Sequence, residues 1–251
     1  MTQVGPAFWG GDNPGVVTLL MNMVGTVGSN TFTDESAFGA LITTYGGATS
    51  LKPVINPGPP QNMLSGSGAV TEGRGAYTAI LPGGANSLSN LGTLPFCIEM
   101  RVRPWQFQTP TGSYPQDFFN SLFTGGGQNG VGLGLSVNNN FKLGLDSPST
   151  GGYIVTGPIP TLLQTYHLAG VRDGDILTLY VDGSPVGSVA LPANYAVVAN
   201  SVSNRGYDIS GCFNASLGAH NDYVNKYALR FTRGWARYFG PFAPPAPPWT
   251  S

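Results

Sequence analysis

The 251-residue sequence predicts an all-β domain, either a sandwich or a barrel, with little or no helix. Apolar residues alternate with polar residues or glycine in several segments, and Asp-Gly dipeptides typical of tight turns join some of them. No stretch carries a convincing helical period, and the best candidate, residues 116–123, is short. Many short strands without helices are typical of sandwiches and barrels, and a sandwich of this length often forms one domain.

The segment 96–103 alternates strongly. Its apolar face, which we expect in the core, consists of Phe96, Ile98, Met100 and Val102. Its opposite face carries Cys97, Glu99, Arg101 and Arg103. Pro104 then ends the predicted strand, because proline has no N–H to donate to a neighbouring strand.

A hairpin is predicted over residues 131–145. Apolar residues occupy every second position from Val131 to Val137, and the alternation resumes from Phe141 to Leu145. The three residues between these strands, 138–140, are all asparagine. Asparagine tolerates a positive φ, so this triplet favours a three-residue loop.

A meander of three strands is predicted for the segment 167–190. Strands 167–172, 175–181 and 184–190 are separated by Asp-Gly dipeptides, which favour tight turns. Pro185 in the third strand indicates a sheet edge or a bulge.

The C-terminal part combines a last strand with an extended tail. Tyr227, Leu229 and Phe231 alternate, and prolines then recur through residues 241–251. Two earlier stretches, 56–68 and 192–211, have few strand signals. We expect three parts: an N-terminal arm at 1–15, a sandwich at 16–240 and a proline-rich tail at 241–251.

Weak charge is the most unusual property of the composition. Charged residues make up 9% of the chain, against roughly 25% in ordinary domains. The net charge is −1 and no basic stripe could neutralise phosphates, so a nucleic-acid partner is not expected. The apolar run 16–24 is shorter than the ~20 residues of a membrane span, and no signal peptide or membrane segment is expected.

Several segments resemble laminin-G-like, concanavalin-type domains. Residues 167–183 (HLAGVRDGDILTLYVDG) resemble their strand–turn–strand signature, and residues 94–104 (LPFCIEMRVRP) resemble their central core strand. Residues 229–245 are similar to the closing strand and tail of versions found in tailed-phage structural proteins. Residues 17–20 and 31–36 are similar to their opening strand. The resemblance implies an antiparallel, two-sheet jelly-roll sandwich.

No catalytic residue is predicted, and the chain is not expected to be an enzyme. Glucanases of this superfamily carry paired acids on one strand, and retaining hydrolysis needs two carboxyls about 5 Å apart. In the comparable strand here, Glu99 is followed by Arg101 and Arg103 where the partner acids would stand. We expect Glu99 and Arg101 to form an exposed ion pair.

Cofactors are not expected, although calcium stays open. His167 and His220 fit no zinc spacing. Some relatives bind calcium through loop carboxylates, but no acidic spacing here resembles a dedicated calcium loop, and solvated turn residues are the alternative. The acids in or near predicted loops are Asp34, Glu35, Asp173, Asp175 and Asp222. Cys97 and Cys212 are interpreted as buried free thiols, with a disulfide as the alternative.

Aromatic side chains are the candidates for contact with a partner or a glycan. The four proposed are Trp9, Tyr114, Phe242 and Trp249. Trp and Tyr are typical anchors of interfaces, and we favour contact with a neighbouring subunit over contact with a sugar. The tail is expected to pack on another chain; the alternative is that it closes its own sandwich. Trp235 and Tyr238 are expected in the core or at a corner.

The resulting hypothesis is a non-catalytic structural or decorating virion protein of a tailed bacteriophage, on the capsid or the tail. Its expected location is the surface of the particle, and its expected partners are other virion proteins and further copies of itself. The alternative is a carbohydrate-binding module that attaches to host or other surface glycans, and both roles can hold together. A glycoside hydrolase is disfavoured because the acid pair is missing.

Overall fold

The computed structural model describes fifteen parts of the chain, and all of them are strands, turns or loops. They are residues 16–23, 31–37, 39, 41–45, 54–56, 63–65, 75–79, 91–107, 116–120, 131–145, 152–197, 205–209, 213–214, 218–219 and 224–249. None of the described residues is helical, as the sequence predicts. Accordingly, no helix in these parts is long and apolar enough to cross a membrane.

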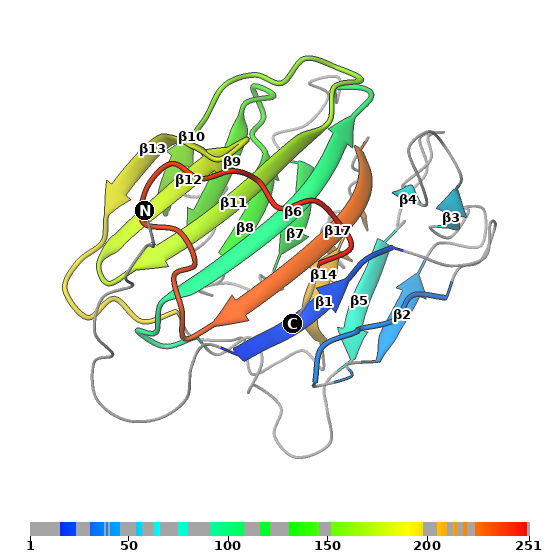
Figure 1. Cartoon of the computed structure of the whole chain (residues 1–251), viewed down its shortest axis with the longest axis horizontal. Coiled ribbons are helices and arrows are strands. Elements are labelled where there is room, and N and C mark those ends of the chain that lie inside the picture. Colours follow the sequence, from blue (N-terminus) through cyan, green and yellow to red (C-terminus); the bar gives the residue numbers. More distant parts are fainter. Residues whose placement is uncertain are drawn as a thin grey trace.

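Two large antiparallel sheets form the domain, and Figure 1 shows them as stacked layers. The larger has the order β13-β12-β11-β6-β17-β4-β3, with β1 also paired to β17. Its strands are β1 (Val16–Met21), β3 (Val54–Asn56), β4 (Met63–Ser65), β6 (Phe96–Pro104), β11 (Tyr166–Asp173), β12 (Ile176–Val181), β13 (Ser184–Ala190) and β17 (Val224–Arg233).

The second large sheet has seven strands in the order β10-β9-β8-β7-β14-β5-β2. Its strands are β2 (Ile42–Tyr45), β5 (Gly75–Ala79), β7 (Gln116–Asn120), β8 (Val131–Leu135), β9 (Phe141–Leu145), β10 (Tyr153–Thr156) and β14 (Arg205–Ile209). A separate two-stranded ribbon pairs β15 (Phe213–Asn214) with β16 (Gly218–Ala219). This arrangement confirms the predicted two-sheet sandwich of the jelly-roll type.

The core lies between the sheets and is built by the predicted alternation. Strand β6 is central, with β11 on one side and β17 on the other. Met100 pairs with Leu168 and with Leu229, and all three side chains are fully buried in the main apolar cluster. The apolar faces of β8 and β9 close this cluster from the opposite sheet.

The turns follow the predicted chemistry. Gly174, Asp182 and Gly183 all have positive φ, at 56°, 48° and 79°. Asn139 has a φ of 62° in the loop that joins β8 to β9. Strand β13 lies at the sheet edge and its pairing with β12 contains a bulge, so both readings of Pro185 are correct.

Two parts of the chain form strands that the sequence indicates only weakly. Residues 116–120, within the short and unconvincing helix candidate, form strand β7. A register shift between Asp117 and Phe119 places Phe118 and Phe119 both in the core, which breaks the period-two pattern. Strand β14 also lies within a stretch that was expected to be irregular, because its tertiary pairing, not its local pattern, stabilises it.

Truncation of Met100 to alanine should lower the free energy of unfolding by about 2–5 kcal/mol, because it removes a fully buried side chain from the central strand. Urea unfolding measures this value. Val137→Ala is the control: Val137 is 47% exposed, and its truncation should change stability by about 0.5 kcal/mol or less. Equal effects of the two changes would mean that the core face of β6 is wrongly assigned.

Candidate functional site

The outer face of the larger sheet is covered by residues 234–249, here called the C-terminal strap. Gly234, with a φ of 80°, follows β17, and its N–H donates to the Pro95 carbonyl at 2.8 Å. Figure 1 shows the strap, in red, turning back across β6, β11 and β12 before returning to β17. The strap therefore forms a third layer on the sandwich.

The middle of the strap packs through small and aromatic side chains. Ala236 lies in a buried cluster with Cys97 and Tyr180. Tyr238 and Phe242 stack with parallel rings at 3.5 Å between centroids and pack against the same cluster. The Phe242 N–H donates to the Gly183 carbonyl at 2.9 Å. A Cβ at position 183 would lie 1.8 Å from the Phe242 carbonyl oxygen, so glycine is required there.

The end of the strap is anchored by Trp249, which is only 4% exposed. Its indole packs against Val17, Leu20 and Ala228. The Asn22 side chain pairs with the Trp249 backbone in both directions: Trp249 N donates to Oδ1 at 2.7 Å, and Nδ2 donates to the Trp249 carbonyl at 3.0 Å. The strap thus ends in a buried and fully hydrogen-bonded contact.

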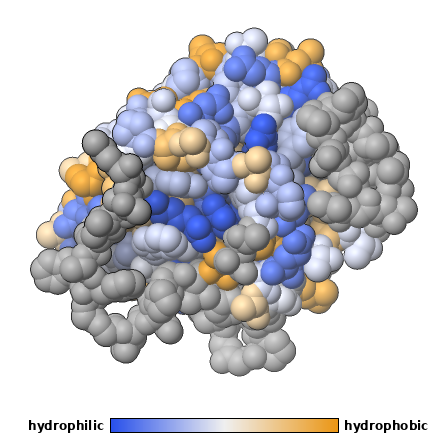
Figure 2. All heavy atoms as spheres, viewed as in Figure 1, coloured by the Kyte–Doolittle hydropathy of each residue, from blue (hydrophilic) through white to orange (hydrophobic). Residues whose placement is uncertain are grey.

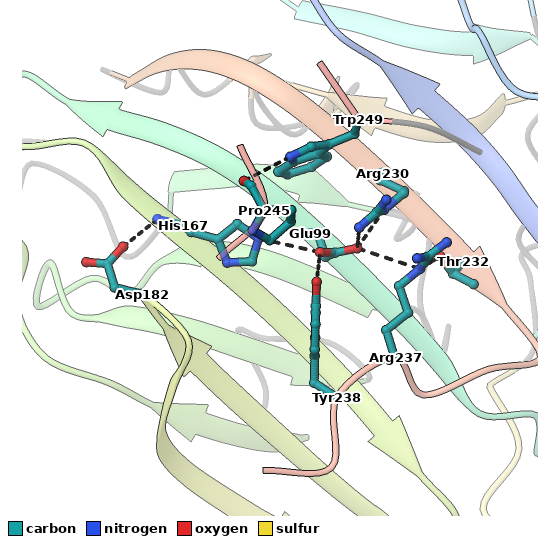
Figure 3. A network of polar contacts seen from close by, with 9 residues as sticks. All are labelled: Glu99, His167, Asp182, Arg230, Thr232, Arg237, Tyr238, Pro245 and Trp249. Carbon is teal, nitrogen blue, oxygen red and sulfur yellow. Dashed lines mark hydrogen bonds and ion pairs between the residues drawn. The ribbon is translucent and has the colours of Figure 1, made fainter. Parts of the chain in front are cut away.

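Under the strap lies Glu99, a carboxylate with no exposed surface (Figure 3). Arg230 of β17 approaches Oε2 with both Nε and Nη2 at 2.7 Å. Tyr238 of the strap donates its hydroxyl to Oε1. Two further cations or potential cations are near: His167 Nε2 lies 3.4 Å from Oε1 and Arg237 Nε lies 3.8 Å from Oε2.

Burial and charge fix the protonation of this cluster. Burial alone raises the pKa of Glu99, but the contacts with His167, Arg230 and Tyr238 outweigh it and hold the pKa at about 2. Burial and the adjacent Glu99 charge raise the pKa of Tyr238 far above its ordinary value. Glu99 is therefore a permanent anion at neutral pH and is poorly suited to act as a general acid.

His167 is the least satisfied member of the cluster. Its backbone N–H donates to Asp182 Oδ1 at 2.8 Å, which ties β11 to the β12–β13 turn. Its ring is enclosed by Tyr238, Phe242 and Trp249, with centroid distances of 6.5, 5.6 and 5.6 Å. Neither ring nitrogen meets hydrogen-bond geometry within the described residues. The imidazole contributes mainly through packing and its contact with Glu99.

The expectation that Glu99 and Arg101 form an exposed ion pair is wrong. Glu99 is fully buried and its ion-pair partner is Arg230, from a strand 131 positions away in sequence. The alternation of Leu229 and Phe231 with Arg230 indicates that Arg230 shares the outer face with Glu99, and this signal could have identified the pair.

The four aromatic candidates divide between described and undescribed parts of the chain. Trp9 and Tyr114 lie outside the described residues. Phe242 is half-buried and Trp249 is buried, both against their own sheet. This placement corresponds to the alternative in which the tail closes its own sandwich. Trp235 was expected in the core or at a corner and is 46% exposed, directly after Gly234, which has a positive φ.

The candidate calcium ligands are dispersed. Asp34 Oδ1 accepts the N–H groups of Leu20 and Ser36, both at 2.9 Å, so this carboxylate organises the segment beside β1. Asp173 and Asp175 are exposed at the β11–β12 turn, and Asp222 lies outside the described residues. No group of three or more His, Cys, Asp or Glu side chains in the described parts could hold a metal ion. Cys97 is a buried free thiol, whereas Cys212 is not described.

The chain belongs to the concanavalin A-like lectin/glucanase superfamily, whose laminin-G-type family model matches residues 75–218. No curated protein sequence matches it. This assignment confirms the resemblance to laminin-G-like, concanavalin-type domains. Glu99 and His167 lie within the matched residues, whereas Arg230 and the strap follow them.

Solved structures share the fold at low sequence identity. The binding domain of botulinum neurotoxin serotype D is 12% identical, with a TM-score of 0.58 over 88% of this chain and 48% of that one. Domain 4 of the Geobacillus stearothermophilus arabinanase AbnA is 15% identical, with a TM-score of 0.58 over 88% and 94%. Trypanosoma rangeli sialidase is 12% identical, with a TM-score of 0.52 over 87% and 31%. The chain thus spans about half of the toxin binding domain and almost all of the arabinanase domain.

Trp249→Ala should lower the free energy of unfolding by about 3–5 kcal/mol, because it removes the buried anchor of the strap. Phe239→Ala is the matched control, since Phe239 is 43% exposed on the same strap and its loss should be nearly neutral. Thermal and urea unfolding measure both. A neutral Trp249→Ala variant would show that the strap does not depend on this contact.

Glu99→Gln should make stability less sensitive to acid. Because folding lowers the pKa of Glu99 from 4.5 to about 2, its contribution is present above pH 4.5 and is lost as the pH falls toward 2. The shift corresponds to on the order of 3 kcal/mol at neutral pH. The variant should therefore be less stable at pH 7 and lose less stability between pH 5 and 2. Asp175→Asn, at an exposed turn, is the control and should retain the wild-type acid profile.

Proposed function

We propose that this chain is a non-catalytic, lectin-like binding domain that attaches its carrier to a glycan-bearing surface. The observation that carries the proposal is the state of Glu99, the acid on the central strand where related glucanases place theirs. It is ion-paired to Arg230, hydrogen-bonded to Tyr238 and covered by the strap. A carboxylate held in this way is poorly suited to act as a general acid, and its burial denies a substrate access to it as a nucleophile.

The chain's own sequence supports a binding role over hydrolysis. The positions two and four residues after Glu99 carry Arg101 and Arg103, not acids, so the strand offers no second carboxylate for a retaining or inverting pair. Domain 4 of AbnA, which shares the fold over nearly its full length, was solved in complex with arabinotriose. The same architecture therefore accommodates a saccharide in another protein, and we extend that class of ligand to this chain.

The carrier in this proposal is a tailed-phage particle, on which the chain serves as a decorating or fibre component of the capsid or tail. Support comes from the resemblance of residues 229–245, which form the end of β17 and most of the strap, to the closing segment of phage structural proteins. The low charge of 9% suits a subunit that packs among other virion proteins or further copies of itself. Mass spectrometry of purified particles and electron microscopy with the chain labelled test this location. Its absence from the particles would overturn the carrier but not the glycan-binding role.

The purified chain should bind members of a glycan array and release no reducing sugars from polysaccharides, because Glu99 has no partner acid. Glu99→Gln should not change the hydrolysis baseline. Heat-unfolded chain is the control for non-specific adsorption to the array. Hydrolytic turnover that disappears in Glu99→Gln would overturn the non-catalytic proposal, and an array with no bound glycan would overturn the lectin role.

A further inference from the structure

The first turn of the strap presents a tryptophan and an arginine together on the surface. Trp235 is 46% exposed, which is unusual for so large an aromatic side chain. The Arg237 guanidinium lies over its ring, with Cζ 5.1 Å from the ring centroid. One ring face is thus occupied by a cation, and the exposed remainder of the indole is available to a ligand.

Contacts with Thr232 and Glu99 hold the Arg237 side chain in place. Its Nε donates to Thr232 Oγ1 at 2.7 Å, and the same Nε lies 3.8 Å from Glu99 Oε2 (Figure 3). Among the described residues, its terminal nitrogens have no hydrogen-bond or ion-pair partner, and 17% of the side chain is exposed. The side chain is therefore preorganised through Nε while its terminal donors stay unused.

Within the described parts of the chain, two arginines face the one carboxylate of Glu99. Arg230 and Arg237 both lie within 4.0 Å of the single Glu99 carboxylate, and Arg230 already approaches it through two nitrogens. Arg237 is the more distant and the more exposed of the two, so Glu99 compensates its charge less completely than that of Arg230. Burial and the neighbouring Arg230 charge lower the pKa of Arg237, so a ligand anion at its terminal nitrogens would relieve an unfavourable charge.

We propose that Trp235 and Arg237 form a binding site for a carboxylate-bearing sugar. The sugar ring stacks its C–H face on the exposed indole, and the sugar carboxylate pairs with the terminal nitrogens of Arg237. This inference rests on the proposed glycan-binding function and names its substrate class as acidic glycans, whether their carboxylate comes from a uronic acid or from a sialic acid.

The surroundings favour a sugar over an apolar partner. Figure 2 shows the apolar residues of the described part as separate orange patches among polar surface on the face that the strap crosses. A protein interface core is typically a continuous apolar patch, whereas a saccharide needs one aromatic platform and a few oriented polar groups. An arginine with free terminal nitrogens can pair with both oxygens of a carboxylate at once.

Binding of matched acidic and neutral sugars by the full chain tests the site. Calorimetric titrations compare sialyllactose with lactose, and galacturonate oligomers with galactose oligomers. At least one acidic probe should bind about tenfold or more tightly than its neutral counterpart, the difference that one charge-assisted contact supplies. The probe that shows this preference identifies the source of the carboxylate.

Two variants locate the binding and two serve as controls. Arg237→Gln should remove the preference for the acidic probe, and Trp235→Ala should weaken binding of both members of the pair by about tenfold. Arg103→Gln removes a positive charge elsewhere on the outer face of β6, and Phe239→Ala removes another exposed aromatic ring of the strap; both should bind like wild type. Thermal unfolding confirms that each variant is folded, since Arg230 and Tyr238 still satisfy Glu99 when Arg237 is changed.

The results of these titrations distinguish failure of the Trp235–Arg237 site from failure of the glycan-binding function. Glycan binding without acid preference, or with a preference that survives Arg237→Gln, overturns the Trp235–Arg237 site and leaves the lectin role intact. Absence of any glycan binding overturns both. Loss of self-association or of attachment to another protein in Trp235→Ala, with glycan binding unchanged, identifies the pair as a protein contact and also overturns the site.

Discussion

The Glu99–Arg230 ion pair is the interaction on which the outer layer of this domain depends. A carboxylate without exposed surface is unfavourable unless charge and hydrogen bonds compensate its loss of water. Here β17 supplies Arg230, β11 supplies His167, and the strap supplies Tyr238. Strands β6 and β11 and the continuous segment of β17 and the strap are thus held in one arrangement. Displacement of the strap would expose the rings and remove one hydrogen bond from the anion.

Proline residues lower the entropy cost of ordering the strap, and aromatic residues supply its apolar contacts. Prolines recur through residues 241–248, and proline has less backbone freedom to lose on folding than other residues. The strap is held without a ladder of backbone hydrogen bonds. Gly234 bonds to Pro95 at its start, Phe242 bonds to Gly183 in its middle, and Trp249 pairs with Asn22 at its end. The stacked rings of Tyr238 and Phe242 supply the apolar area that excludes water from Glu99.

The sequence predicts most of the sandwich core but little of the candidate site. Period-two alternation and Asp-Gly turns are local signals, so the meander of β11, β12 and β13 and the core face of β6 follow from them. The register shift between Asp117 and Phe119 interrupts the alternation in β7, so the sequence pattern does not predict this strand. Glu99 has only Arg101 as a visible partner nearby, whereas its actual partners are 68 to 139 residues away: His167, Arg230, Arg237 and Tyr238.

The two sides of the strap have different roles. Its inner side chains neutralise and cover Glu99, which removes the one carboxylate of the central strand from contact with a substrate. At the first turn of the strap, Trp235 is exposed and directly follows Gly234, which has a positive φ just beyond β17. Arg237 connects the two sides, since its Nε faces Thr232 and Glu99 while its guanidinium covers the indole. The charge of Arg237, which Glu99 compensates only in part, therefore lies against the exposed indole of Trp235, so that covering the acid and recognising an acid are consequences of the same segment.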